Sequence, residues 1–211
     1  GNRVVVDDAD SIYAINKVIE QLNPGDIFII SERNERNFAP FMFNLGEGYV
    51  EFVNEDGSFL PKADAMQNYK KYLIHLGQKI NDRGAIMILF QPTPSFRNIV
   101  IGLDRVCSEW FVRYNRLCSS DMGAIGRREW LEHVSDIIKM HDEVADKFDG
   151  GVFTFDPLRY LCPENIDKCT RRMNDKMLYI DNDHLSNDSN EIIYPNFVSL
   201  LESKGLLNQS N

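Results

Sequence analysis

The segment AIMILFQPTP, residues 85–94, decides the fold class, because it is a short, continuous apolar run that ends in prolines. Such a run predicts a β-strand buried on both faces, since a half-exposed strand would alternate apolar and polar residues. DIFII, residues 26–30, is a similar run earlier in the chain, and GGVFTFDP, residues 150–157, is a third strand candidate. We therefore expect three strands of one sheet.

Amphipathic segments separate these strands. Apolar residues recur at helical spacing, which predicts helices over residues 11–22, 63–82, 127–148 and 190–207, with Pro195 near the first turn of the last one. A short strand or extended segment is expected at residues 176–181. Strands that alternate with longer helices indicate a parallel sheet with helices on both faces. We predict one α/β domain over residues 1–211, with an irregular insertion at about residues 95–127.

Composition excludes some functions. The chain has 211 residues and a formal net charge of −9, so its surface repels phosphate backbones and a nucleic-acid partner is not expected. No apolar run reaches the roughly 18 residues that span a bilayer. We therefore expect no membrane insertion by this chain itself, and any membrane role would need a fused or partner domain.

The four cysteines are Cys107, Cys118, Cys162 and Cys169. They form no C-x-x-C pair, and no histidine lies at zinc-finger spacing from them, so no metal site is indicated. Cys162 and Cys169 flank the polar loop PENIDK, which suggests a disulfide and an extracytoplasmic compartment. The alternative is four unpaired thiols in a cytosolic protein.

A candidate catalytic pair lies near the C-terminus, in LYIDNDHLSNDSNEII at residues 178–193. Asp181 precedes His184 by three residues, and an acid so placed in a turn can reach Nδ1, fix the tautomer and stabilise the cation of the ring. We expect the adjacent Asp183 to point elsewhere. The alternative is a polar turn that holds a surface or capping histidine. The other histidines fall in predicted helices and are expected to be structural: His75, His133 and His141.

The segment around His184 resembles the C-terminal signature of the SGNH-type hydrolases, the GDSL esterase superfamily. It is most similar to the domain fused to membrane acyltransferase-3 O-acyltransferases, in which an aromatic residue, one residue, Asp, two residues and His-Leu-Ser precede the last helix. LNPGDIFIISERN resembles the strand with the third conserved block, and GAIMILFQPTPSF the strand that ends in prolines. DPLRYLCPENIDKC resembles the segment with paired cysteines before the catalytic Asp.

This resemblance implies a three-layer α/β/α fold, SGNH/flavodoxin-like, and Ser–His–Asp chemistry on O-acyl esters without a metal or organic cofactor. His184 would be the base and Asp181 the residue that orients it. The family also uses an asparagine in its oxyanion hole, in a turn after the third strand. Asn34 is the match here, with Asn37 as a rival and Glu32 in place of the family's glycine. Two asparagines in a polar turn are the alternative interpretation.

The match breaks at the nucleophile, because no Gly-Asp-Ser occurs in the chain. The nearest candidate is Ser11, preceded by Asp10 in RVVVDDADSIYAI, although an Asp-Asp-Ala insertion separates it from the apolar run. The family has a further strand and helix before DIFII, so a chain that starts after the first two blocks is the simpler interpretation. Ser31 and Ser186 are weaker candidates, and Ser186 is expected to cap the last helix.

Two functions compete. The first is an esterase or O-acyltransferase domain that moves acetyl or a similar acyl group to or from a hydroxyl, on a carbohydrate or another extracytoplasmic acceptor. The second is a non-catalytic SGNH-like module or fragment, used for binding or for association with a membrane acyltransferase. A serine beside His184 would favour the first. An unrelated α/β binding protein with a chance D-x-x-H is a third, weaker possibility.

Overall fold

The computed structural model describes most of the chain. The described residues are 9–31, 58, 60–96, 124–174, 176–181 and 183–207, of which residues 9–12 are described by their backbone alone. The Cα positions divide the chain into two compact units. The first unit comprises Gly1–Gln91 and Ser135–Phe155, and the second comprises Pro92–Val134 and Asp156–Asn211.

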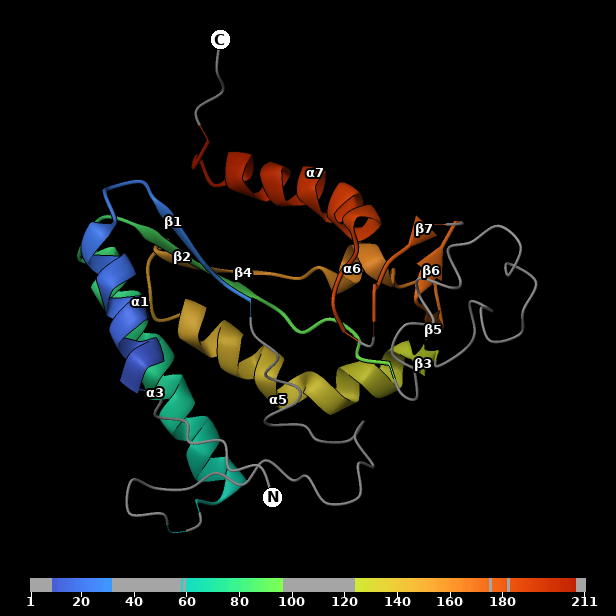
Figure 1. Cartoon of the computed structure of the whole chain (residues 1–211), viewed down its shortest axis with the longest axis horizontal. Helices are drawn as coiled ribbons and strands as arrows, with labels where there is room; N and C mark the ends of the chain where they lie inside the picture. The colour runs from blue at the N-terminus through green and yellow to red at the C-terminus, as the bar shows by residue number, and fades with distance from the viewer. Residues whose placement is uncertain are drawn as a thin grey trace. The chain divides into compact units, whose positions relative to one another are not determined.

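Three parallel strands form the sheet of the first unit (Figure 1). They are β1 (Ile27–Ile30), β2 (Ile86–Phe90) and β4 (Val152–Phe155), in the order β1-β2-β4. The central strand contains Met87, Ile88 and Leu89, and all three side chains are fully buried. This confirms the predicted parallel α/β sheet, and the prediction that residues 85–94 hold a strand buried on both faces.

Strand β1 differs from its prediction. Ile30 is buried, but Ile29, on the opposite face of the strand, is 46% exposed. Among the described strands β1 lies at the end of the sheet, and only the face of Phe28 and Ile30 packs against the apolar core. Burial on both faces is therefore wrong for this strand.

Helices cover one face of the sheet in the first unit (Figure 1). They are α1 (Ala9–Gln21), α3 (Lys62–Asn81) and the C-terminal part of α5 (Arg127–Ala145), a helix that continues from the second unit. Leu73 and Ile80 from α3 and Val144 from α5 are fully buried with Met87 and Leu89. Each fully buried Leu, Ile or Val side chain contributes about 1.5–3 kcal/mol to folding. The apolar residues that recur at helical spacing in these segments are therefore the ones that stabilise the core.

The second unit contains α6 (Leu158–Leu161), α7 (Asn187–Ser203) and two small antiparallel pairs. In these pairs β3 (Ile125–Gly126) lies beside β5 (Lys168–Cys169), and β6 (Arg172–Met173) beside β7 (Lys176–Met177). The short strand or extended segment predicted at residues 176–181 contains β7, which pairs with β6. The predicted disulfide between Cys162 and Cys169 is present, with 5.2 Å between the two Cα atoms.

The last helix begins earlier than predicted. Helix α7 starts at Asn187, so Pro195 lies inside it and not near its first turn. The reason is the cap: the side chain of Ser186 accepts the backbone amide of Ser189, as expected for an N-cap serine. Pro195 removes one amide donor, and the Asn196 side chain donates to the carbonyl of Ile192 at 2.8 Å in the same turn.

Most of the predicted insertion at residues 95–127 lies outside the described residues, and so do Cys107 and Cys118. The organisation as one domain over residues 1–211 stays a prediction. None of the described helices is both long and apolar enough to cross a membrane.

Candidate functional site

Asp181 and His184 lie in a tight turn of the second unit. Tyr179 and Leu185 form an antiparallel bridge across its base, and the amide of Ile180 donates to the carbonyl of His184 at 2.9 Å. The backbone therefore doubles back between the two candidate residues. A spacing of three residues brings their side chains together because the turn is closed in this way.

Hydrogen bonds connect the residues at the start of α7 to Met177 in β7 and to Leu178 after it. The hydroxyl of Ser186 donates to the carbonyl of Met177, and that of Ser189 donates to the carbonyl of Leu178. The carboxylate of Asp188 accepts the amide of Met177 at 2.8 Å. Ser186 and Ser189 are buried, so these bonds are shielded from water. The His-Leu-Ser part of the signature thus has a structural role of its own.

Buried aromatic rings support the turn from within. Phe96, in the segment that follows β2, meets Tyr179 edge-on with 4.8 Å between ring centroids. Both side chains are 1% exposed. Tyr179 is the aromatic residue of the D-x-x-H signature, and it anchors the chain two positions before Asp181.

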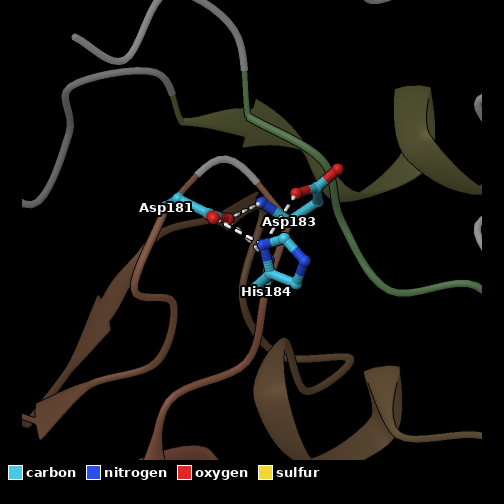
Figure 2. A group of neighbouring side chains, drawn as sticks. All are labelled: Asp181, Asp183 and His184. Atoms are coloured by element: carbon cyan, nitrogen blue, oxygen red, sulfur yellow. Dashed lines mark hydrogen bonds and ion pairs between the residues drawn. The ribbon is translucent and has the colours of Figure 1, made fainter. Parts of the chain in front are cut away.

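The carboxylate of Asp181 has three hydrogen bonds (Figure 2). Its Oδ1 accepts the amides of Asp183 and His184 at 3.0 and 2.8 Å, and its Oδ2 is bonded to Nδ1 of the His184 ring. Burial opposes ionisation, but these amides and the imidazole lower the pKa of Asp181 to about 2. A carboxylate only accepts hydrogen bonds, so Nδ1 donates and Nε2 is the basic nitrogen of the neutral ring.

The ring of His184 is accessible, since 57% of its side-chain surface is exposed. Figure 2 shows Nε2 on the side of the ring that faces away from Asp181. An imidazole held at Nδ1 and open at Nε2 is suited to general-base chemistry, because its lone pair can take a proton from an incoming hydroxyl.

Asp183 does not point away from this pair, contrary to the expectation from sequence. Its Oδ1 lies 3.6 Å from Nδ1 of His184, and only 9% of its side chain is exposed. Asp181, Asp183 and His184 offer ligand atoms within 4.8 Å of one another. Because Nδ1 of His184 is already bonded to Asp181, we interpret these residues as a paired acid and base and assign no metal to them.

The other candidate residues are placed less fully. Ser11 lies in α1, and its side chain is outside the described residues, as are Asn34 and Asn37 entirely. Ser31 follows β1 and is exposed, whereas the hydroxyl of Ser186 is buried and engaged in capping. Of the predicted site residues, the described structure therefore brings together Asp181 and His184.

Arg171 was missed by sequence reasoning. It is 8% exposed and interacts electrostatically with the Asp181 carboxylate. Its ten-residue separation from Asp181 carries no periodic or motif signal. The amide of Leu178 donates to the carbonyl of Arg171 at 2.7 Å, so the backbone of Arg171 lies beside the segment that leads into Asp181.

The other histidines lie in helices, as predicted: His75 in α3, and His133 and His141 in α5. His141 is 1% exposed, and burial lowers its pKa to about 4. Its Nδ1 lies 3.2 Å from Oε1 of Gln91 at the end of β2. A cavity of about 510 Å³ lies between α1 and α3, and none of the described candidate residues lines it.

Comparison with known proteins gives one match that covers most of the chain. Residues 4–199 match the family described as the SGNH domain (fused to AT3 domains). No curated protein and no solved structure shows significant similarity to the chain.

Proposed function

Because the chain belongs to the family of SGNH domains fused to AT3 domains, we propose that it is an esterase or O-acyltransferase domain. It moves an acyl group to or from a hydroxyl of a carbohydrate, and acetyl is the acyl group that we propose. The observation that carries this proposal is the bond between Asp181 and Nδ1 of His184, with Nε2 on an exposed ring, inside the family's signature segment.

The reaction needs a serine nucleophile. The serine oxygen attacks the acyl carbonyl carbon while Nε2 of His184 takes the hydroxyl proton, and Asp181 stabilises the resulting imidazolium. The leaving alkoxide departs with that proton, and an acyl-serine remains. The acceptor hydroxyl, or water, then gives its proton to Nε2 and attacks the acyl carbon of the acyl-serine. The bond from that carbon to the serine oxygen breaks, and Nε2 returns the proton to this oxygen, which restores the free serine and the neutral base.

Ser11 is the serine that the sequence offers for this role, and Asn34 is the proposed oxyanion donor. Ser11 is the third residue of α1, and the positive end of a helix favours the developing alkoxide. Asn34 follows β1 in the chain, and the family resemblance matches it to the oxyanion asparagine, with Asn37 as the rival.

The proposed place of action is outside the cytoplasm. The Cys162–Cys169 disulfide supports it, because cytosolic thiols are kept reduced. The proposed partner is a membrane acyltransferase domain of the AT3 type, which would deliver or accept the acyl group.

Hydrolysis of p-nitrophenyl acetate tests the proposal. The chain is compared with His184→Ala, Ser11→Ala and, as a matched control, His75→Ala at an exposed position of α3. We expect activity in the wild type and in His75→Ala, and its loss in the other two variants. A fluorophosphonate probe followed by mass spectrometry identifies the reactive serine. If only His184→Ala loses activity and the probe labels another serine, the assignment of Ser11 as the nucleophile is wrong, while the assignment of His184 as the base stands.

A non-catalytic module is the second candidate, and the lack of a Gly-Asp-Ser sequence in the 211 residues favours it. It predicts no hydrolysis above the His184→Ala background and no labelled serine. In that case the pair of Asp181 and His184 would serve binding or association with the acyltransferase.

A further inference from the structure

An exposed isoleucine lies opposite His184 in the turn that holds the candidate catalytic pair. Tyr179 and Leu185 form the antiparallel bridge at the base of this turn, and the amide of Ile180 donates to the carbonyl of His184 at 2.9 Å. Ile180 and His184 are therefore the next opposed residues, and residues 181–183 connect them. In an antiparallel pair, opposed side chains project from the same face, with their Cβ atoms about 4.5–5.5 Å apart.

The two faces of this short antiparallel pair differ in burial. On one face Tyr179 is buried and Leu185 is half-buried. On the other face Ile180 is 55% exposed, and 57% of the His184 side chain is exposed. A single exposed apolar residue is ordinary on a protein surface. The place of Ile180 gives its exposure a consequence, because a substrate that reaches Nε2 of His184 arrives beside this side chain.

The alcohol part of an ester substrate has to come next to the imidazole. In the reaction proposed above, Nε2 of His184 first gives a proton to the leaving alkoxide and later takes one from the acceptor hydroxyl. Each transfer needs the alcohol oxygen within about 3.2 Å of Nε2. The acyl chain is attached to the other side of the carbonyl carbon. A side chain beside the imidazole is therefore placed to contact the alcohol part.

We propose that Ile180 is a specificity-determining residue of the acceptor site: its exposed side chain contacts the apolar surface of the alcohol part of the substrate, such as the C–H face of a sugar ring. This inference rests on the proposed function. A sugar ring carries its hydroxyls at the rim and C–H bonds on its faces. An isoleucine can cover such a face without a hydrogen bond, and the removal of both surfaces from water favours binding.

Two variants with side chains of the same shape test the contact. Ile180→Val keeps an apolar, β-branched side chain, whereas Ile180→Thr has nearly the same shape and adds a hydroxyl. Ile29→Thr makes the same kind of change at an exposed isoleucine of β1 and serves as the control. Ethyl and hexyl acetate vary the alcohol part at constant acyl group. The acetate and butyrate esters of p-nitrophenol vary the acyl part at constant alcohol.

We expect kcat/KM in the wild type to be higher for hexyl acetate than for ethyl acetate, because the longer alkyl chain covers more of Ile180. The hexyl-to-ethyl ratio should be roughly 3- to 10-fold lower in Ile180→Thr than in Ile180→Val. The butyrate-to-acetate ratio should be the same in these two variants, and Ile29→Thr should keep both wild-type ratios. Equal hexyl-to-ethyl ratios in the two Ile180 variants, or a butyrate-to-acetate ratio that falls at least as much, would overturn the proposal.

N-hexylacetamide, in which an amide replaces the ester, tests the contact without hydrolysis. In protein with ¹³C-labelled isoleucine δ1 methyl groups, the signal of Ile180 is the one that disappears in Ile180→Val. We expect the ligand to shift this signal and to leave that of Ile29 in place. In competition with p-nitrophenyl acetate, or by ¹⁵N amide shifts if no ester is hydrolysed, its dissociation constant should be roughly 3- to 10-fold higher in Ile180→Thr than in Ile180→Val.

The two kinds of failure are distinguishable. If the wild type hydrolyses none of the esters, the proposed function fails, and the binding of N-hexylacetamide still decides the role of Ile180. An Ile180 signal that stays in place up to the solubility limit of the ligand would overturn the contact, whether or not the esters are hydrolysed.

Discussion

Asp181 holds the imidazole of His184 with one carboxylate oxygen and the backbone of the turn with the other. Oδ2 is bonded to Nδ1 of the ring, while Oδ1 accepts the amides of Asp183 and His184. The residue that orients the ring therefore also shapes the loop that carries the ring. Substitution at Asp181 therefore affects both the orientation of the ring and the shape of the turn. Asp181→Asn preserves the second role, because the side-chain oxygen of Asn can still accept the backbone amides.

Asp181→Asn is expected to lower kcat for acetyl-ester hydrolysis by about 100- to 10,000-fold, because the amide stabilises neither the correct tautomer nor the imidazolium. The thermal unfolding temperature should change little, since the bonds to the turn can persist. Asp183→Asn is the matched control: it removes a neighbouring acid whose Oδ1 is 3.6 Å from Nδ1, and its effect should be at least tenfold smaller. Equal losses in both variants would contradict the assignment of Asp181 as the orienting acid.

The sequence predicted the described core well, because one physical pattern carries it. Burial in one apolar core explains the apolar runs at residues 26–30 and 85–94 and the helical spacing at residues 63–82. Where the pattern failed, the cause was the position of the element. Ile29 is as apolar as Ile88, yet one lies at the end of the described sheet and the other at its centre.

The site was only partly predictable. A spacing of three residues suggested the bond between Asp181 and His184, because a turn can join them locally. The place of Asp183 could not be found in this way, since its approach to 3.6 Å from Nδ1 of His184 depends on how the turn folds. The start of α7 was misjudged although Ser186 was expected to cap this helix: Pro195 suggested a later start, but the Ser186 cap sets the start at Asn187.

His141 should make stability depend on pH. Its pKa is about 4 in the folded chain and about 6.5 when exposed, so between about pH 6.5 and 4 the unfolded state binds the proton and the folded state mostly does not. The free energy of unfolding should therefore fall as the pH drops from about 6.5 to 4, by on the order of 2–3 kcal/mol. Urea denaturation at pH 7, 5.5 and 4.5 measures this.

The matched pair for this measurement is His141→Gln and His75→Gln. His141→Gln keeps a donor for Oε1 of Gln91 but cannot take up the proton, so its stability should fall less steeply between pH 7 and 4.5. His75 is exposed on α3, and His75→Gln should retain the wild-type slope. Identical slopes in the wild type and His141→Gln would show that other groups cause the dependence.

Ser186→Ala should destabilise the chain through the start of α7. The change removes the acceptor for the amide of Ser189 and leaves the carbonyl of Met177 without its hydroxyl donor. The expected loss is about 1–2 kcal/mol, the usual range for an N-cap serine with a buried partner. Ser203→Ala removes an exposed hydroxyl near the other end of α7 and should cost less than about 0.5 kcal/mol. A loss in Ser186→Ala no larger than in Ser203→Ala would argue against this cap.

The disulfide should stabilise the second unit by closing the loop between α6 and β5. Cys162 and Cys169 are seven positions apart, and a loop of this length corresponds to on the order of 2–3 kcal/mol in the chain-entropy description. The double variant Cys162→Ser with Cys169→Ser is preferable to a reductant, which would not discriminate these cysteines from Cys107 and Cys118. We expect urea denaturation to show this loss in the free energy of unfolding of the double variant. Thr170→Ser, in the position next to Cys169, should change the free energy of unfolding by less than about 0.5 kcal/mol.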